Sequence, residues 1–374
     1  MPTQFDKWWN DTKKHYKRLH YWLPPAKELK LQVGNTRPFR YFTLCARSMI
    51  DVFMLAREGV LAYDPIQGVV TDVRFCELDN EQFPEILELV GAENAGFFGE
   101  LEDLVLFQDN DFTAQYPTLD SIEEALEDEG LSIEYRKRLQ TKRIHIYLKS
   151  SFPYDFINLD FCGYYYPRPP EILRINQTVQ RFLDWQRAPG PSDASVKKKI
   201  TANTFLLSVT CRHDNDFPQD AETRLANLVR SNCRSHAAYK RYLENSRGIT
   251  DLNTWIKSTR DDFFLSTWPK EISAMAKEYQ WDVEVIGYLN YDRLSDENQP
   301  YKIICLMCRF KRVTDDPNYL QVAIDALDQS KRKLILDISR NSEQGKDLLK
   351  NLSEIVKLRN QQAQIKQRPL LPDP

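Results

Sequence analysis

The segment Tyr154–Tyr166 constrains the fold more than any other part of the chain, because it joins a buried strand to an acid and a glycine. Its sequence is YDFINLDFCGYYY, in which the apolar residues Phe156, Ile157 and Leu159 lead directly into Asp160. In open α/β sheets, ligands bind at the carboxyl ends of the strands. The segment therefore predicts a carboxylate and exposed backbone at a ligand-binding sheet edge.

Segments with the pattern of strands alternate with helical segments along most of the chain. The predicted strands are Tyr41–Cys45, Val69–Leu78, Arg143–Leu148, Tyr154–Asp160 and Phe205–Thr210. The predicted helices include Met49–Leu55, Asn80–Val90, Leu119–Leu126, Ile172–Trp185 and Asp220–Asn245. This alternation indicates an α/β fold with a doubly wound, mostly parallel sheet. Two long strands, Trp281–Leu289 and Tyr301–Phe310, follow without a helix between them and predict an antiparallel C-terminal hairpin.

Helical extensions flank this core. Residues 3–22 mix aromatic and basic side chains and are expected to end at Pro24 and Pro25, whereas residues 317–365 are helical and increasingly polar. The expected division is a basic-aromatic arm over residues 1–37, an α/β core over 38–315 and a helical extension over 316–374. The arm suits either docking on the core by its tryptophans or contact with a phosphate backbone. The C-terminal helix is a candidate surface for a protein partner.

The composition is that of a folded chain, with 42% hydrophobic and 28% charged residues. No apolar run approaches the roughly 18 residues that span a bilayer. The charged N-terminus has no hydrophobic region of the kind found in secretory signals. Seven cysteines, mostly inside apolar runs, favour reduced thiols. We therefore expect a cytoplasmic protein without a membrane partner.

The spacing of four cysteine and histidine residues raises the alternative of a metal site. The residues concerned are Cys211, His213, Cys233 and His236. Such side chains bind zinc, but C-x-H is not a usual spacing for a zinc pair. Cys305 and Cys308 lie within one strand, so their side chains should point to opposite faces. We predict no metal site, and the motifs of P-loop NTPases, α/β-hydrolases and zincins are absent from the sequence.

The order of these elements resembles the Rossmann-like class I methyltransferases, which use S-adenosylmethionine. FTLCARSMIDVF resembles their first strand, turn and helix, and VRFCELD resembles the second strand with its terminal acid. FINLDFCGYYY resembles the fourth-strand motif and is closest to the form found in tRNA guanine-N2 dimethyltransferases. FLLSVTCR and the closing pair of strands resemble the fifth strand and the final hairpin. The resemblance spans residues 38–312 and is one of order and pattern.

The resemblance implies a role for each matching residue. Glu77 would bind the ribose hydroxyls of the cofactor, and the turn after the first strand would face its methionine end. The implied cofactor-binding residues are Ala46, Arg47, Ser48, Asp51, Glu77 and Gly163. The residues implied to orient the methyl acceptor are Asn158, Asp160 and Tyr164. Tyr164 could stack on a flipped base, as enzymes that modify bases require, so nucleic acid is the expected partner.

Two departures from the family pattern leave a second interpretation open. The first turn has no glycine to let the backbone approach a cofactor closely, and Phe161 stands where the fourth-strand motif usually has proline. The alternative is a catalytically inactive scaffold that binds nucleic acid or a partner protein, for instance in a phage-defence complex. In that case Glu77 and Asp160 would cap the turns or helices that follow their strands.

Overall fold

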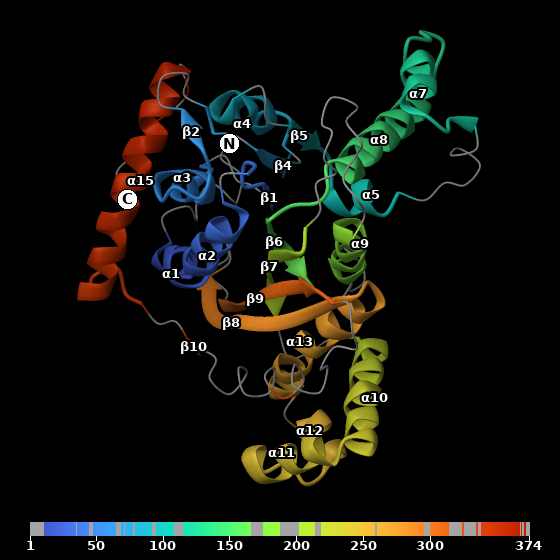
Figure 1. Cartoon of the computed structure of the whole chain (residues 1–374), viewed down its shortest axis with the longest axis vertical. Coiled ribbons are helices and arrows are strands. Elements are labelled where there is room, and N and C mark those ends of the chain that lie inside the picture. The colour runs from blue at the N-terminus through green and yellow to red at the C-terminus, as the bar shows by residue number, and fades with distance from the viewer. Residues whose placement is uncertain are drawn as a thin grey trace.

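The structure of the chain is a computed structural model. It describes residues 11–34, 36–44, 48–64, 69–70, 72–77, 79–91, 95–107, 115–165, 175–187, 202–213, 218–258, 260–294, 300–313, 324, 334–335, 338–366, 368 and 370–371. Its centre is an 8-stranded sheet of order β10-β8-β9-β7-β6-β1-β4-β5 (Figure 1). The strands of this sheet are β1 (Tyr41–Leu44), β4 (Val73–Glu77), β5 (Ala95–Phe98), β6 (Phe156–Tyr164), β7 (Thr204–His213), β8 (Trp281–Leu294), β9 (Pro300–Arg312) and β10 (Leu334–Ile335). The short strands β2 (Tyr63–Asp64) and β3 (Val69–Val70) pair separately.

Helices connect the strands and flank the sheet. The N-terminal ones are α1 (Thr12–Lys17), the π-helical segment η2 (Arg18–Trp22) and α2 (Leu23–Val33). Those between β1 and β7 are α3 (Ile50–Arg57), α4 (Gln82–Val90), α5 (Leu101–Val105), α7 (Leu119–Leu126), α8 (Ile133–Ser150) and α9 (Ile175–Arg187). The remaining ones are α10 (Gln219–Ser235), α11 (Ala237–Arg247), α12 (Leu252–Ser258), α13 (Arg260–Glu278) and α15 (Glu343–Ile365). No helix among the described residues is long and apolar enough to cross a membrane.

The predicted fold class is confirmed. Strands β5, β4, β1, β6 and β7 run parallel to one another, and β9 pairs antiparallel with both β7 and β8. Helices cover both faces of the sheet (Figure 1). One hydrophobic cluster joins the sheet to α5, α9, α10 and α13, and the other joins it to α2, α3, α4 and α15. This is a doubly wound sheet with an antiparallel hairpin beside its parallel part.

The strand predicted at Arg143–Leu148 is wrong, because these residues belong to α8. The prediction used six alternating residues, which a longer helical segment overrides. Ser132 caps the helix by accepting a hydrogen bond from the backbone N–H of Tyr135 at 3.2 Å. Within α8, Leu139 and Leu148 are buried, so the helix packs by a narrow face.

The predicted helix end at Pro24 and Pro25 is also wrong. Both prolines lie in the first turn of α2, where a missing backbone N–H has no helical partner to lose. The helix continues to Gly34, whose φ of +63° ends it. The result is one helical segment over residues 12–33, named here the N-terminal segment.

The N-terminal segment packs on the sheet instead of projecting from it. Trp22, Ala26 and Leu29 lie in the cluster shared with β1, β6 and β7. Gly287 of β8 faces the ring of Tyr21 so closely that a Cβ atom there would overlap it. The basic residues Lys17 and Arg18 are buried as well. Docking on the core is therefore the interpretation that the structure supports for this segment.

The C-terminal helix α15 packs on the same layer and meets the N-terminal segment at a buried histidine. Nε2 of His15 lies 3.3 Å from Oδ1 of Asn351, and Arg57 of α3 donates to the Asn351 carbonyl at 3.3 Å. His15 is fully buried. Burial, reinforced by the charge of Arg18, lowers the pKa of His15 to about 3. The two ends of the chain are thus joined through an imidazole that is neutral when folded.

The buried His15 should make the protein less stable in acid. In the unfolded chain the histidine has a pKa near 6.5, so between pH 6.5 and 3 it is protonated when unfolded but neutral when folded. The free energy of unfolding should therefore fall as the pH drops from about 6.5 towards 3, by up to about 1.4 kcal/mol per pH unit. Urea unfolding as a function of pH should show a shallower slope for His15→Gln. The exposed-site control His236→Gln should keep the wild-type slope, and equal slopes in all three proteins would contradict the burial of His15.

Alanine at position 287 should loosen the N-terminal segment. The added Cβ meets the Tyr21 ring, so Gly287→Ala should lower the free energy of unfolding by about 1–3 kcal/mol. Gly130→Ala, at an exposed turn beside α8, is the control and should stay within about 0.5 kcal/mol. Denaturant unfolding measures both. A neutral Gly287→Ala would mean that Tyr21 does not pack against β8.

Candidate functional site

Glu77 and Asp160 lie level with each other at the carboxyl edge of the sheet. Tyr41 of β1 pairs with Val73 of β4 and with Phe156 of β6. Glu77 lies four residues after Val73 on β4, and Asp160 lies four residues after Phe156 on β6, so the two acids share one row across the sheet. They are separated by two strand spacings, about 10 Å. Because side chains alternate along a strand, both carboxylates point to the face that carries Phe156 and the N-terminal segment.

The Glu77 carboxylate is fixed by the turn that follows β4. Its Oε1 accepts a hydrogen bond from the Asp79 N–H at 2.9 Å, and its carbonyl accepts from the Gly99 N–H at 3.1 Å. Asp79, and not Glu77, caps α4 by accepting from the N–H groups of Glu81 and Gln82. These hydrogen bonds lower the pKa of Asp79. Glu77 is thus an oriented, partly exposed carboxylate beside the end of β1.

The Asp160 carboxylate is paired with the N-terminal segment. Nζ of Lys14 lies 2.6 Å from its Oδ2, and Nζ of Lys17 lies 4.0 Å away. The Asp160 side chain is 15% exposed, so the pair is only partly in water. Lys17 also donates to Oγ1 of Thr210 at 2.9 Å and lies 4.5 Å from the Trp22 ring. The acceptor side of the predicted site therefore carries two ammonium groups of the chain itself.

Asp51 and Asn158 belong to a buried network behind the edge. Oδ2 of Asp51 accepts from the Tyr41 hydroxyl at 2.7 Å and from Thr43 at 2.8 Å. Asn158 donates to Oγ1 of Thr43 at 3.0 Å. Burial, followed by the Asp51 charge, raises the pKa of Tyr41 well above its usual value. The network holds α3 against β1, and no described residue bonds to Oδ1 of Asn158.

The turn between β1 and α3 is only partly described. Ser48 is buried, and Met49 has a positive φ of 49°. Bulky residues rarely adopt this conformation, and such strain gathers at functional sites. Ala46 and Arg47 lie outside the described residues.

The end of β6 is irregular. The strand register shifts between Asp160 and Tyr164, so the backbone of Gly163 lies in a bulge. The side chain of Tyr164 lies outside the part of the chain that the structure describes. Tyr165, the next residue, is fully buried against Trp268, with ring centroids 5.1 Å apart. The predicted stacking role of Tyr164 stays a prediction.

Sequence reasoning missed the residues that complete this site. It did not single out Thr43 and Thr210, nor the pairing of Lys14 and Lys17 with Asp160. The two lysines are three residues apart and so share a helix face. That spacing signals a common target, but it does not identify the acid.

The cysteines contribute no metal centre among the described residues, where no group of three or more His, Cys, Asp or Glu side chains could hold an ion. Cys76, Cys211, Cys233, Cys305 and Cys308 are free thiols. Cys305 and Cys308 belong to clusters on opposite faces of the sheet, as predicted.

Comparisons with known proteins add little to this geometry. No family model matches the sequence, and no curated protein matches it. Among solved structures, the chain is similar to a Pyrococcus horikoshii protein whose description assigns it provisionally as a transferase. The sequence identity is 10% and the TM-score 0.28, over 77% of this chain and 64% of that chain. The chain thus spans less than two thirds of that protein, and a similarity this low carries no argument about the fold or the function.

The Lys14–Asp160 pair should contribute measurably to stability. A double-mutant cycle with Lys14→Met and Asp160→Asn should give a coupling energy of about 1–2 kcal/mol, because the pair is mostly shielded from water. The more exposed pair Lys27–Glu58 is the control and should couple by less than about 0.5 kcal/mol. Denaturant unfolding of the four proteins in each cycle provides the numbers. Zero coupling for the first pair would show that Asp160 is not bound to Lys14 in solution.

Proposed function

We propose that this chain is a methyltransferase-like protein that binds S-adenosylmethionine at the sheet edge between Glu77 and Asp160 and acts on nucleic acid. The observation that carries the proposal is the common row and common face of these two carboxylates. They flank the end of β1, and a ligand placed over β1 would have one on each side.

The strand order supports this location. Strands β4 and β5, which follow β1 in the chain, lie on one side of β1 in the sheet, whereas the later strands β6 and β7 lie on its other side. The order of the sheet therefore reverses between β1 and β6, and such a switch point is where open α/β sheets bind ligands. Glu77 and Asp160 lie on the two strands next to β1 at this point. The strained Met49 lies on the turn that follows β1.

Glu77 suits the ribose end of the cofactor. A carboxylate accepts hydrogen bonds from two vicinal hydroxyls, and bonds to a charged acceptor are stronger than neutral ones. The hydrogen bond from Asp79 holds the carboxylate in place before a ligand arrives. When bound, S-adenosylmethionine supplies a methyl group activated by its positive sulfur.

Asp160 suits an acceptor that carries an amine. Its present partner is the ammonium of Lys14, which shows that the position accommodates a nitrogen donor at 2.6 Å. An exocyclic amine of a base would take this place while Lys14 moves to another acceptor. Holding the amine in line with the methyl group is the main contribution required, since methyl transfer depends largely on positioning.

A specific observation favours the second candidate, a catalytically inactive scaffold. Lys14 and Lys17 already neutralise Asp160, and Phe161 is buried in the core where the family motif has proline. In that case Asp160 anchors the N-terminal segment and does not meet a substrate. The two candidates differ in cofactor binding and in turnover.

Cofactor binding tests the proposal directly. Isothermal titration with S-adenosylmethionine should give saturable heat for the wild-type chain. Glu77→Gln should weaken binding by about 10-fold to 100-fold, because it removes a charged acceptor worth about 1.5–3 kcal/mol. Glu81→Gln, an exposed neighbour at the start of α4, is the matched control and should bind like the wild type.

Two results would contradict this prediction in different ways. No heat from the wild-type chain at high protein concentration would exclude the cofactor and leave the scaffold. Wild-type affinity in Glu77→Gln would exclude Glu77 as the ribose ligand. Saturable binding without any methyl transfer to RNA or DNA would point to an inactive scaffold that retains the cofactor.

A further inference from the structure

A helical lobe follows β7 and extends beyond the sheet. It consists of α10, α11 and α12, and it lies below the sheet in Figure 1, with α11 at its lower end. Because β7 is parallel to β6, the chain leaves β7 at the same carboxyl edge that carries Asp160. Helix α10 begins at Gln219, six residues after His213. The lobe therefore starts beside the proposed site and leads away from it.

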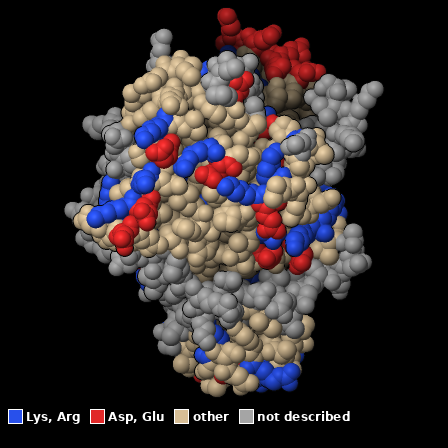
Figure 2. Space-filling model, turned by 60° about the vertical axis from the view of Figure 1, so that its left-hand side comes forward, with Lys and Arg blue, Asp and Glu red and all other residues tan. Residues whose placement is uncertain are grey.

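The charge of this lobe differs from that of the chain as a whole. The chain has a net charge of −3, yet residues 223–243 contain five basic residues and no acid. These are Arg224, Arg230, Arg234, Lys240 and Arg241. Figure 2 shows Lys and Arg at the lower end of the molecule, whereas Lys, Arg, Asp and Glu are interspersed over its middle part. Over residues 219–258 the whole lobe has seven Lys and Arg against four Asp and Glu, so it carries a net positive charge on an acidic protein.

Most of these cations are available to a ligand. Arg230 donates to the amide oxygens of Asn227 and Asn253, which are neutral. Arg234 and Arg241 are exposed, and across the described ranges no carboxylate lies within ion-pair distance of Arg230, Arg234 or Arg241. Lys240 lies 3.7 Å from Glu244 in an exposed pair, which is a weak contact.

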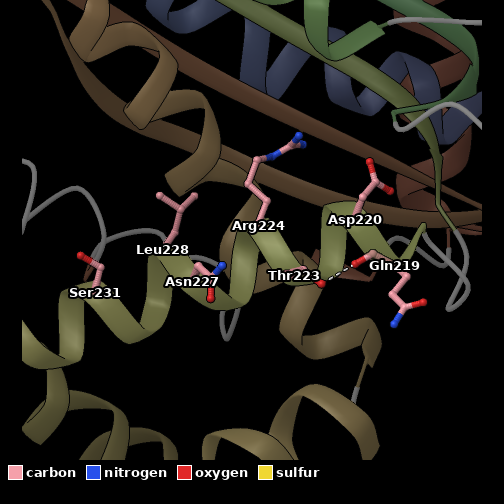
Figure 3. A pocket seen from close by; sticks show the side chains of 7 residues that line it. All are labelled: Gln219, Asp220, Thr223, Arg224, Asn227, Leu228 and Ser231. Atoms are coloured by element: carbon pink, nitrogen blue, oxygen red, sulfur yellow. Dashed lines mark hydrogen bonds between the residues drawn. The ribbon is translucent and has the colours of Figure 1, made fainter.

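A shallow depression runs along the first three turns of α10, before Arg234 and Arg241. It has a volume of about 720 Å³, and Figure 3 shows side chains of α10 along it. Its lining residues are Gln219, Asp220, Thr223, Arg224, Asn227, Leu228 and Ser231. These residues supply two amides, two hydroxyls, the Arg224 guanidinium, the Asp220 carboxylate and one apolar side chain. Arg224 is held by the buried Glu271 at 2.5 Å, which fixes one wall of the depression.

The size and chemistry of this face fit a phosphodiester chain. The 17 residues of α10 span about 25 Å, and each nucleotide of a stacked strand adds one phosphate per about 3.4 Å along the helix axis. Guanidinium groups bind phosphate with paired hydrogen bonds. A membrane surface is a poorer fit, because surface-binding helices insert an apolar face and Leu228 is the sole apolar residue among those that line the depression.

We propose that the exposed face of α10 and the start of α11 bind the phosphate backbone of a nucleic acid and lead it to the sheet edge. This inference rests on the proposed function, because the nucleic acid bound here would be the methyl acceptor. The binding itself requires only Arg230, Arg234 and Arg241. The chain then carries its nucleic-acid surface on the lobe and not on the N-terminal segment.

Fluorescence anisotropy with labelled single-stranded RNA and DNA of about 20 nucleotides tests the proposal. The full-length variant Arg230→Gln/Arg234→Gln/Arg241→Gln should bind at least about 10-fold more weakly at about 100 mM salt. Its plot of log affinity against log salt should be shallower by about 2, since each lost phosphate contact removes about 0.7. The control Arg340→Gln/Lys346→Gln/Lys350→Gln removes the same charge from exposed residues at and before α15 and should bind like the wild type.

The outcomes separate this inference from the proposed function. Equal affinity of the two triple variants, or no binding of any probe by the wild type, would overturn the lobe surface even if S-adenosylmethionine binds. Loss of oligonucleotide binding with cofactor titration unchanged would support it. Equal loss of binding to vesicles of anionic phospholipid would assign the surface to membranes and overturn the nucleic-acid proposal. The single variant Arg234→Gln, with a smaller loss expected, covers the case in which the triple variant fails to fold.

Discussion

The ion pair between Lys14 and Asp160 connects the two parts of the molecule on which the account depends. It joins the N-terminal segment to the carboxyl edge of the sheet, because Nζ of Lys14 lies 2.6 Å from Oδ2 of Asp160. Lys17 reinforces it through Thr210 on the neighbouring strand. The same carboxylate is thus both a structural anchor and the candidate group for an acceptor. Whether a ligand can displace Lys14 decides between an enzyme and a scaffold.

Strongly patterned segments were predictable from the sequence. The buried strand around Phe156–Asp160 and the closing hairpin have enough apolar residues to define strands over their whole length. Arg143–Leu148 misled because six alternating residues fit a strand locally, whereas the capped 18-residue helix α8 includes them. Pro24 and Pro25 misled because proline ends a helix from its interior but fits its first turn.

The site was predictable only in part. Strand-end position placed Glu77 and Asp160 at one edge, and the register confirms that they share a row. The pairing with Lys14 joins residues 146 positions apart in the sequence, and no local pattern encodes such a contact. Asp51 is held inside by Tyr41 and Thr43. The cofactor roles of Ala46, Arg47 and Gly163, and the division of the chain near residues 37 and 315, stay predictions.

The central claim is that a nucleoside cofactor binds over the end of β1, between Glu77 and Asp160. A crystal structure of the full chain with S-adenosylhomocysteine tests it most directly. We expect the ribose hydroxyls within hydrogen-bond distance of the Glu77 carboxylate and the sulfur on the side of Asp160. Ligand density elsewhere on the molecule, or an edge without ligand at saturating concentration, would contradict it.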